Sequence, residues 1–492
     1  MKGVGSVAGG NIFSVAGRRP NENLTLLNGV DYPGASNQSS TPGGASGLML
    51  GVESVREYNM LTNDYGAEYG KKAGAQVNVV TQSGTNQLHG SIFEFLRNSA
   101  LDARNFFEPT IGPFKRNNFG GAVGGPIRKD KTFIFGNYEG LRQRLAIPTI
   151  TFSPDANARK GLIPCGTSGP ACPSGTPTGT PTLVPNLDPR ILPFLDLWPV
   201  PTVSLGGGVG QAFSNPTQAI RQDFGTIRVD QLFSGKDTLS GVYTIDDGVN
   251  VSPAQDPLFG TTYTIRTQIA SLTETHIFSP QVINTFTAGF SRAFFHSINS
   301  NLDPALTTYA FVSGKPAGAI SIGSQNVSTS GTLTAVGSAN PDILFRRNLF
   351  TYTDGLQVIR GRHQISAGVW FQRSQSNDND PSGSLGQATF TNLTTMLQGT
   401  VSAFKVAPSG TEMGWRAWLG AWYLQDSIQV RPNLTIRVGV RHEFSTKWSE
   451  VNGRAGQEVF VNGLLQTDPI VGRVFNTVNN SKWLIEPRIN LA

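Results

Sequence analysis

Hydrophobic and polar residues alternate with a period of two along most of the chain from about His89 onward. The stretch Leu434–Glu443 separates into an apolar set and a polar set: Leu434, Ile436, Val438 and Val440 against Thr435, Arg437, Gly439, Arg441 and Glu443. Successive side chains of a strand point to opposite faces, so this pattern predicts strands with one apolar and one polar face. His363–Arg373, Asp223–Gln231 and Thr238–Asp246 repeat it.

The lengths of these strands indicate a membrane. Many run about 9–12 residues, against about 5–6 in soluble proteins. Ten residues at about 3.4 Å each, tilted near 45°, climb about 24 Å, close to the ~25 Å apolar band of an outer-membrane barrel. We therefore predict an all-β fold built on a large antiparallel transmembrane β-barrel, with one strand face toward lipid and one toward a wet lumen. On this basis Val438→Arg is more costly than Thr435→Arg.

Aromatic residues and long connections fit the same architecture. Two long stretches, Ala146–Gln218 and Asn299–Asn340, are rich in Pro, Gly, Ser or Thr and are predicted to be irregular extracellular loops. Aromatic residues near strand ends are candidates for interface girdles, with ordinary core aromatics as the alternative: Phe93, Phe95, Phe133, Phe135, Tyr138, Trp415, Trp418, Trp422 and Tyr423.

The first 85 residues have a different pattern. Their strands are short and are separated by turn signals at Asn28-Gly29, Tyr32–Gly34 and Pro42–Gly44. A helix is plausible near Val52–Tyr58. We predict a small mixed α/β unit ahead of the barrel.

Composition excludes several classes of protein. In 492 residues, charged residues make up 15 % and hydrophobic residues 38 %, with 57 Gly and 30 Pro, which argues against coiled coils and helical bundles. The 29 Phe and 7 Trp argue against a charge-rich disordered chain. The net charge of +6 is spread without a dense basic run, so no nucleic-acid partner is expected. No transmembrane helix and no secretory signal are predicted.

Two cysteines, Cys165 and Cys172, lie seven positions apart in a loop-like segment where burial of a thiol is not expected. A pair alone lacks the four ligands of a zinc site. We favour a disulfide formed in an oxidising compartment over two free cysteines.

No catalytic, cofactor-binding or metal site is predicted, and the substrate-binding residues are unknown. Only one of the scattered histidines stands next to a carboxylate in sequence, and we interpret all of them as strand-face residues: His89, His276, His296, His363 and His442. Asp246–Gly248 and Asn377–Asp380 offer oxygen atoms to Ca²⁺, but we favour solvated turns because the twelve-residue calcium-loop pattern is absent. Gly206–Gly210 lacks the G-x-G-x-x-G spacing and is predicted to be a loop.

Val52–Thr81 resembles the closing segment of the plug domain of TonB-dependent outer-membrane receptors. The matching residues are Val52, Val55, Tyr69, Gly70, Gly74, Val77, Asn78, Val79, Val80 and Thr81, whereas Arg56 and Glu57 depart from the pattern. Leu26–Asp31 resembles the plug's L-L-D-G-V turn, with Asn28 replacing Asp.

Later segments resemble the Oar-like branch of these receptors. They are Ser83–Phe107, Phe114–Arg142, Ser279–Asn284, Gly361–His363 and Trp422–Asp426. The resemblance implies that residues 1–85 are the C-terminal part of a plug and 86–492 the N-terminal part of a barrel. We expect about twelve of the family's roughly 22 strands. We therefore expect an open sheet with unpaired edge strands, one at Gly90–Arg97 and one near Ala492, which does not close into a transporter when expressed alone.

The resemblance implies a non-enzymatic function in the cell outer membrane: uptake of a large or scarce substrate through a plugged barrel. The implied partners are outer-membrane lipid, an unknown extracellular substrate, and the TonB complex, which acts through an N-terminal box not visible in this sequence. The alternatives are a non-transporting, adhesin-like surface barrel and a secreted soluble β-protein that binds carbohydrate.

Overall fold

The computed structural model describes residues 13–34, 42–63, 65–104, 111–166, 169–302, 304–323, 333–340, 342–407, 412–472, 474–475 and 483–491. Residues 105–107 of the receptor-like stretch Ser83–Phe107 lie outside this part of the chain, as does Ala492, where an open edge is expected.

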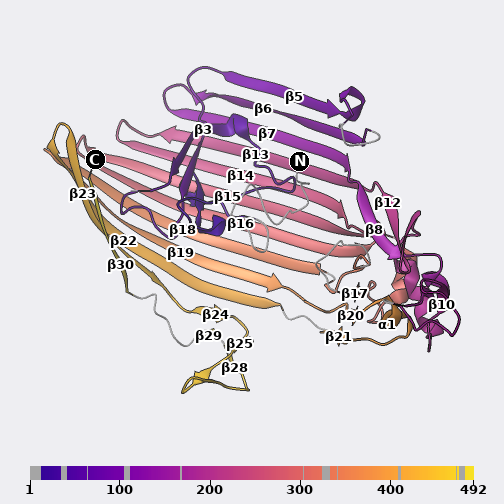
Figure 1. The fold of residues 1–492 in the computed structure, drawn as a ribbon. Helices are drawn as coiled ribbons and strands as arrows, with labels where there is room; N and C mark the ends of the chain where they lie inside the picture. Colours follow the sequence, from indigo (N-terminus) through magenta and orange to yellow (C-terminus); the bar gives the residue numbers. More distant parts are fainter. Residues whose placement is uncertain are drawn as a thin grey trace.

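One large antiparallel sheet of 14 strands forms the body of the molecule (Figure 1). Its long members are β5 (His89–Asn98), β6 (Phe114–Arg128), β7 (Thr132–Ala146), β13 (Thr217–Leu232), β14 (Asp237–Pro253), β15 (Phe259–Ser279), β16 (Val282–Asn301), β18 (Asp342–Arg360), β19 (His363–Asn379), β22 (Met413–Arg431), β23 (Leu434–Ser445) and β30 (Leu484–Leu491). The short strands β24 (Trp448–Glu450) and β29 (Val474–Phe475) continue from β22.

The strands are longer than the 9–12 residues expected from alternation. β15 has 21 residues and β16 has 20. Alternation of apolar and polar residues is clear only in the middle of each strand. Toward the strand ends charged residues also occupy the outward face, as Arg266 does on β15. Among the described residues, β5 pairs only with β6 and β30 only with β23, so the sheet is curved and open.

Burial on the two faces of this sheet is the reverse of that in a soluble protein. On β13, Thr226 and Asp230 are 4 % and 8 % exposed, whereas Ile227 and Val229 are 48 % and 36 % exposed. The same division recurs on neighbouring strands, where Gln372 and Arg441 are buried and Val369 and Val438 are exposed. The polar face is therefore the inward one and the apolar face the outward one, as the alternation predicts.

The candidate girdle aromatics divide between these faces. Tyr138, Trp418 and Trp422 are exposed on the outward face, where a girdle requires them. Phe135 is buried on the inward face, so its assignment to a girdle is wrong. By strand alternation five others also lie inward: Phe93, Phe95, Phe133, Trp415 and Tyr423.

The N-terminal part folds into a small four-stranded sheet, which we call the inner sheet. Its strands are β1 (Leu24–Leu27), β2 (Val30–Asp31), β3 (Val55–Leu61) and β4 (Gln76–Thr81), in the order β2-β1-β4-β3 with β1 and β4 parallel. Asn28 and Gly29 have φ of 49° and 80°, the positive values that a tight hairpin turn needs between β1 and β2.

The predicted helix at Val52–Tyr58 is wrong. One 3₁₀ turn, η2 (Val52–Ser54), leads directly into β3, which pairs with β4. In the described part of residues 13–85 the helices are η2 and the 3₁₀ turn η1 (Pro20–Glu22), so this unit is β rather than α/β. Backbone pairing with the Val-rich β4 outweighs the weak local helical pattern.

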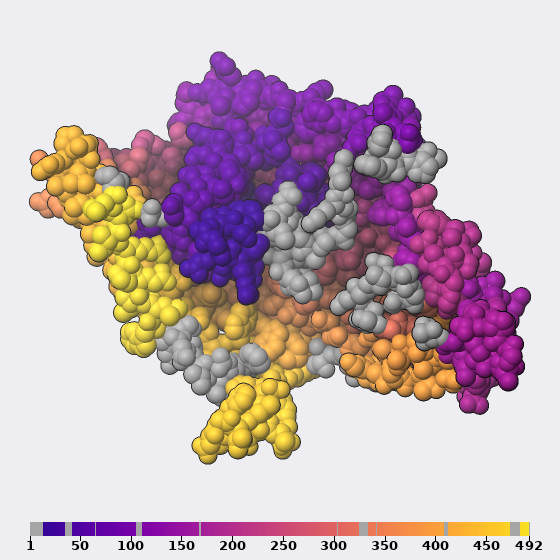
Figure 2. All heavy atoms as spheres, in the orientation of Figure 1, coloured from indigo at the N-terminus to yellow at the C-terminus, as the bar shows by residue number. Residues whose placement is uncertain are grey.

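The inner sheet lies against the polar face of the large sheet. β2 contacts β15, β16 and β18, and η2 contacts β6 and β7. In Figure 2 the inner sheet, in indigo, lies in front of the middle of the large sheet.

Connections at the two ends of the large sheet differ in length. At one end the strands are joined by residues 129–131, 233–236, 280–281, 361–362 and 432–433. At the other end, residues 147–216, 302–341 and 380–412 join strands, and we call their described parts the cap (Figure 1).

The cap is folded, so the expectation of irregular loops is wrong. It contains β8 (Thr149–Pro154), η4 (Ala158–Lys160), β9 (Leu162–Pro164), β10 (Pro181–Leu183), η5 (Pro189–Leu197), β11 (Val203–Gly206), β12 (Val209–Ser214), η6 (Pro304–Tyr309), β17 (Ala319–Ile322), β20 (Gln387–Phe390), α1 (Leu393–Leu397) and β21 (Ala403–Lys405). These elements share one apolar core that includes Trp198, Ile320, Met396 and Leu397. The core combines residues from all three connections, which no local pattern reveals.

A further pair of hairpin-like units follows β24. It comprises β25 (Ala455–Gln457) with β28 (Ile470–Gly472), and β26 (Phe460–Val461) with β27 (Leu464–Leu465), and it projects from the body in Figure 2. Among the described helices, none has both the length and the hydropathy needed to cross a membrane.

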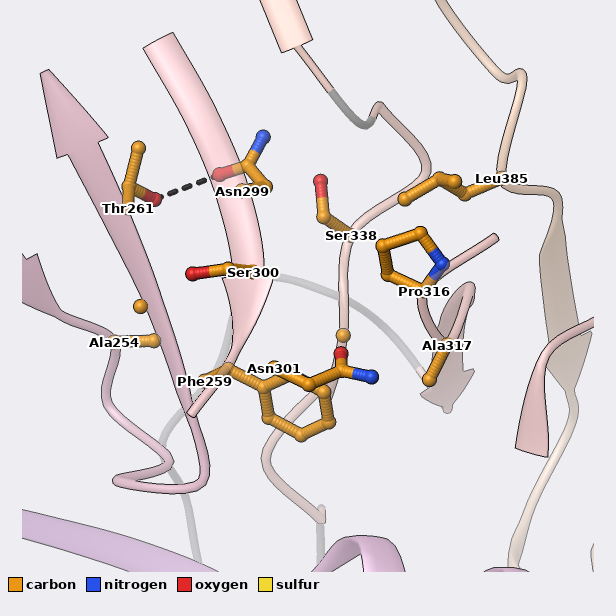
Figure 3. A pocket seen from close by; sticks show the side chains of 12 residues that line it. Ala254, Phe259, Thr261, Asn299, Ser300, Asn301, Pro316, Ala317, Ser338 and Leu385 are labelled. Atoms are coloured by element: carbon orange, nitrogen blue, oxygen red, sulfur yellow. Dashed lines mark hydrogen bonds between the residues drawn. The ribbon is translucent and has the colours of Figure 1, made fainter. Parts of the chain in front are cut away.

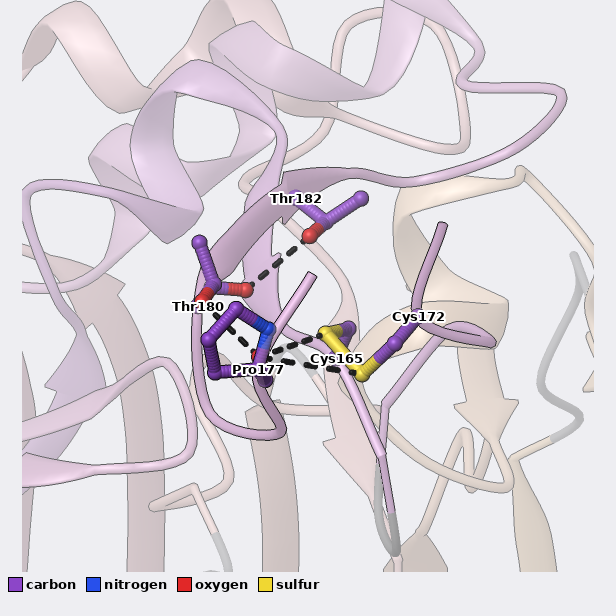
Figure 4. The surroundings of a disulfide bond; sticks show 5 residues. All are labelled: Cys165, Cys172, Pro177, Thr180 and Thr182. Carbon is purple, nitrogen blue, oxygen red and sulfur yellow. Dashed lines mark hydrogen bonds between the residues drawn. A yellow bond between two sulfur atoms is a disulfide. The ribbon is translucent and has the colours of Figure 1, made fainter. Parts of the chain in front are cut away.

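In the cap, Cys165 and Cys172 are bonded to each other beside Pro177 (Figure 4). Cys165 is buried, contrary to the expectation for this segment. The backbone around the pair is held by β9–β10 pairing and by hydrogen bonds between Cys165 and residues 179–180.

We expect replacement of both cysteines by serine to destabilise this part of the cap by about 2–3 kcal/mol, because a loop of about eight residues is no longer closed. The large sheet should be unaffected, since the pair lies outside it. Hydrogen–deuterium exchange of residues 160–185 against that of β13–β16 measures both effects. Titration of two free thiols in protein taken from its native envelope would contradict the disulfide.

Candidate functional site

Side chains from the wall of the large sheet hold the segment 66–71, which joins β3 to β4. Gln425 Oε1 accepts a hydrogen bond from the Ala67 N–H at 2.7 Å, and Glu443 Oε1 accepts one from the Lys71 N–H at 2.8 Å. The buried guanidinium of Arg441 donates to the carbonyl of Ala67 at 3.2 Å and to Glu443 at 2.7 Å. We call Gln425, Arg441 and Glu443 the clamp.

The clamp explains why Gly70, one of the residues that match the receptor motif, has no side chain. A Cβ at Gly70 would lie 2.2 Å from Nε of Arg441 and 2.2 Å from Oε1 of Glu443. Arg488 on β30 closes the other side, donating to the carbonyls of Gly66 and Tyr69 at 2.5 and 2.7 Å. Any side chain at position 70 therefore displaces part of the clamp.

A second anchor is a partly buried ion pair between Lys71 and Asp31. Lys71 also donates to Gln372 Oε1 at 2.8 Å, and its ammonium lies 5.6 Å from the ring centre of Trp370. Gln372 Nε2 in turn donates to Asp31 at 2.7 Å. Both wall residues come from β19, so this strand and the inner sheet share one polar network.

Three more anchors lie toward β7 and β13. Gln222 Oε1 accepts from the Ser46 N–H at 2.9 Å, and Glu139 Oε2 accepts from the Gly51 N–H at 2.7 Å. Asp230 accepts from the Ser83 hydroxyl at 2.6 Å and is paired with Arg228. Arg228 also donates to a carbonyl of β4.

Two small apolar clusters join the N-terminal part to the wall: one at the inner sheet, and one in which Ala45 and Leu50 pack against wall residues Leu141, Ile220 and Phe224. The apolar cluster of the inner sheet contains Leu27, Val30, Tyr32, Val77 and Val79, with Ile269 of β15 as its wall member. Water can replace a polar contact at little net cost, whereas apolar burial cannot be replaced in this way. An interface of this composition can be separated and re-formed.

The cap and the strand ends enclose a cavity of about 120 Å³ (Figure 3). Its polar residues are uncharged: Thr261, Asn299, Ser300, Asn301 and Ser338. Thr261 donates to Asn299 at 2.7 Å, and the buried side-chain nitrogen of Asn301 has no hydrogen-bond partner among the residues that the structure describes. Phe259, Pro316, Ala317 and Leu385 supply apolar walls. The cavity suits a small uncharged polar group.

Asp256 is a buried acid near this cavity, between β14 and β15. One of its oxygens accepts from the Leu258 N–H at 2.9 Å, and the other has no partner in the described part of the chain. Burial raises the pKa of Asp256 to about 7. No pattern in the sequence distinguishes this carboxyl.

All five histidines lie on strands, as expected, and cross-strand pairing places three of them beside carboxylates that are not their neighbours in sequence. His363 contacts Asp426 at 2.6 Å, and His296 contacts Asp342 at 3.4 Å. His276 is bonded to Asp237, and Glu274 completes a group whose spacing would allow a metal ion. The three paired aspartates lie on neighbouring strands, and Glu274 lies on β15 with His276, so only the register between strands reveals the pairs.

The other candidate oxygen sites are not turns. Asp246 and Asp247 lie within β14 on opposite faces: Asp246 accepts from Gln222 inside, and Asp247 pairs with Arg266 outside. Asn377 and Asp378 belong to the end of β19. Gly206–Gly208 form the turn between β11 and β12 with positive φ, as predicted for this loop.

Comparison with known proteins agrees with this architecture. The model of the family "outer membrane beta barrel domain" matches residues 80–492. The chain belongs to this family of outer-membrane β-barrels. The TonB-dependent transporter Oar of Myxococcus xanthus is 33 % identical over 103 residues, which is 19 % of this chain and 10 % of Oar.

Solved structures with the same barrel fold include the outer-membrane transporter YddB from Escherichia coli. It aligns with a TM-score of 0.53 and 11 % identity over 89 % of this chain and 51 % of YddB. The siderophore receptor PirA from Acinetobacter baumannii aligns at a TM-score of 0.48 and 14 % identity over 89 % of this chain and 51 % of PirA. The chain thus spans about half the length of these structures.

These findings place this barrel protein in the outer membrane, and the relatives Oar and YddB are transporters. They also account for the inverted burial, because the outward apolar face of such a barrel meets lipid.

Proposed function

We propose that this chain is part of a TonB-dependent transporter of the Oar-like branch. Residues 1–85 would supply the C-terminal part of the plug and 86–492 the first part of the barrel wall. Substrate would bind at the cap, and the TonB complex would drive displacement of the inner sheet. The substrate is not identified, and the proposal assigns no enzymatic activity.

The observation that carries this proposal is the attachment of the inner sheet to the lumen face. The clamp, the Lys71–Asp31 pair and the Arg228–Asp230 pair hold it by polar contacts, beside two small apolar clusters. A purely structural barrel has no need of a filling that can be displaced. A wide barrel that imports a substrate needs both a seal and a way to open it.

Energy-dependent exposure of the clamp tests the proposal without knowledge of the substrate. Ala67 is fully buried against Gly439, so a cysteine in Ala67→Cys is shielded when the inner sheet is seated. We expect a membrane-impermeant maleimide to label this cysteine in energised cells that contain TonB. Cells that lack TonB, or whose proton-motive force is collapsed, should show little labelling.

The matched control is Ser313→Cys, an exposed position in the cap that should be labelled equally in all conditions. Labelling of Ala67→Cys that is independent of TonB and of energy would reject the transporter in favour of a surface barrel that does not transport.

A further inference from the structure

A cavity of about 550 Å³ lies on the outward surface of the large sheet, near the cap. Its lining comes from four adjacent strands, β6, β7, β13 and β14. By strand alternation most of the lining side chains point outward: Lys115, Asn117, Arg142, Arg144, Ala219, Arg221, Val249 and Val251. The cavity therefore opens toward the membrane environment and not into the lumen.

The cavity lies just beyond the apolar part of this surface. Ile227, Val229 and Leu272 are exposed on the outward face of β13 and β15. Tyr243 lies directly opposite Ile227, and Tyr138 lies two residues nearer the cap, opposite Gly225. Their hydroxyls are bonded to Gln268 and to Asp223 at 2.7 and 2.6 Å. Tyrosines with an apolar ring and a bonded hydroxyl are typical of the boundary between hydrocarbon and headgroups. The cavity is thus at headgroup depth.

Three arginines beside the cavity share two carboxylates. Arg142 pairs with Asp223 at 2.7 Å, Arg266 pairs with Asp247 at 2.7 Å, and Arg221 contacts both acids. The two carboxylates neutralise two of the three arginine charges, so one positive charge remains in this group.

Lys115 and Arg144 have no such compensation. They are exposed, they face each other directly across the β6–β7 pair, and neither has an ion pair or side-chain hydrogen bond in the described part of the chain. Like charges directly opposite each other destabilise a sheet. An anion between them removes that repulsion and gains charge-assisted hydrogen bonds from both.

We propose that this cavity binds the phosphate of a lipid headgroup, with Lys115 and Arg144 as its direct ligands. Ala219, Val249 and Val251 form an apolar wall for the non-polar part of the same lipid. The outward facing and the headgroup depth favour a membrane lipid over phosphate from solution.

The test compares lipid bound by purified protein in detergent, with lipid A, a phosphorylated glycolipid, as the probe. Relative to the unmodified chain, we expect Lys115→Gln/Arg144→Gln to retain about tenfold less lipid A, because two charged donors are lost. Lys115→Arg/Arg144→Lys preserves both charges and should retain it. Lys129→Gln/Lys131→Gln is the matched control, because it removes the same charge at the opposite end of the same hairpin.

Equal retention of lipid A by all these proteins would overturn the proposal. Displacement of lipid A by an equal concentration of inorganic phosphate would overturn the assignment to a lipid. Diacylglycerol, a membrane lipid without a phosphate, should not compete with lipid A, and efficient competition by it would also count against the site. Because both substituted residues are exposed and unpaired, no variant should unfold at a lower denaturant concentration than the unmodified chain.

Discussion

Ile227→Arg is expected to destabilise the membrane-inserted protein by up to about 2–4 kcal/mol, the cost of an arginine on the lipid face, which is largest at the bilayer midplane and falls toward the interfaces. Ile227 is exposed on the outward face of β13, and its cross-strand partners are Gly136 and Tyr243. No acidic side chain lies at either of these pairing positions, so the new charge finds no partner. Denaturant titration of protein folded into lipid vesicles measures the change.

Three further variants make this comparison sharp. Ile227→Val keeps the surface apolar and should cost less than 1 kcal/mol. Val438→Arg should cost less than Ile227→Arg, because Asp426 lies directly opposite Val438 on β22. Thr435→Arg lies on the inward face of β23 and should cost least. Equal destabilisation by Ile227→Arg and Thr435→Arg would contradict the assignment of the two faces.

Arg441→Ala is expected to release the segment 66–71 from the wall. The substitution removes hydrogen bonds to the carbonyls of Ala67 and Glu68 and leaves Glu443 without its ion-pair partner. Breaking a buried pair on one side costs about 3–5 kcal/mol, so hydrogen exchange of residues 66–81 should accelerate by more than about a hundredfold. The exchange of β13–β16 should be unchanged.

Two variants separate the contributions to this effect. Glu443→Gln can still accept from the Lys71 N–H while losing the charge, so its effect should be smaller. Arg431→Ala removes an exposed arginine at the end of β22 and should leave exchange unaltered. If Arg441→Ala and Arg431→Ala gave the same exchange, the clamp would not hold the inner sheet.

Strand alternation was sufficient to predict the all-β class, the long antiparallel strands and the facing of residues such as Val438 and Arg441. The reason is physical: a strand between lipid and a wet interior must separate its apolar and polar side chains at every second residue. The Asn28-Gly29 turn was equally predictable, because only a few residue types tolerate two successive positive φ values. Both are local properties, which a sequence carries directly.

The features that bear on function depend on residues far apart in the chain. The clamp joins Ala67 to Gln425 and Arg441. The cavity on the outward surface joins Lys115 to Arg144 and Val251. The cap core joins Trp198 to Ile320 and Met396. The helix expected at Val52–Tyr58 became a strand for the same reason, since β4 supplies a partner that the local pattern does not reveal. Composition and alternation were enough to determine which face of each strand is polar. Which polar groups meet was determined only by the register between strands and by the packing of distant loops. Residues far apart in the chain can interact only after the fold has brought them together, and the local sequence does not fix that placement.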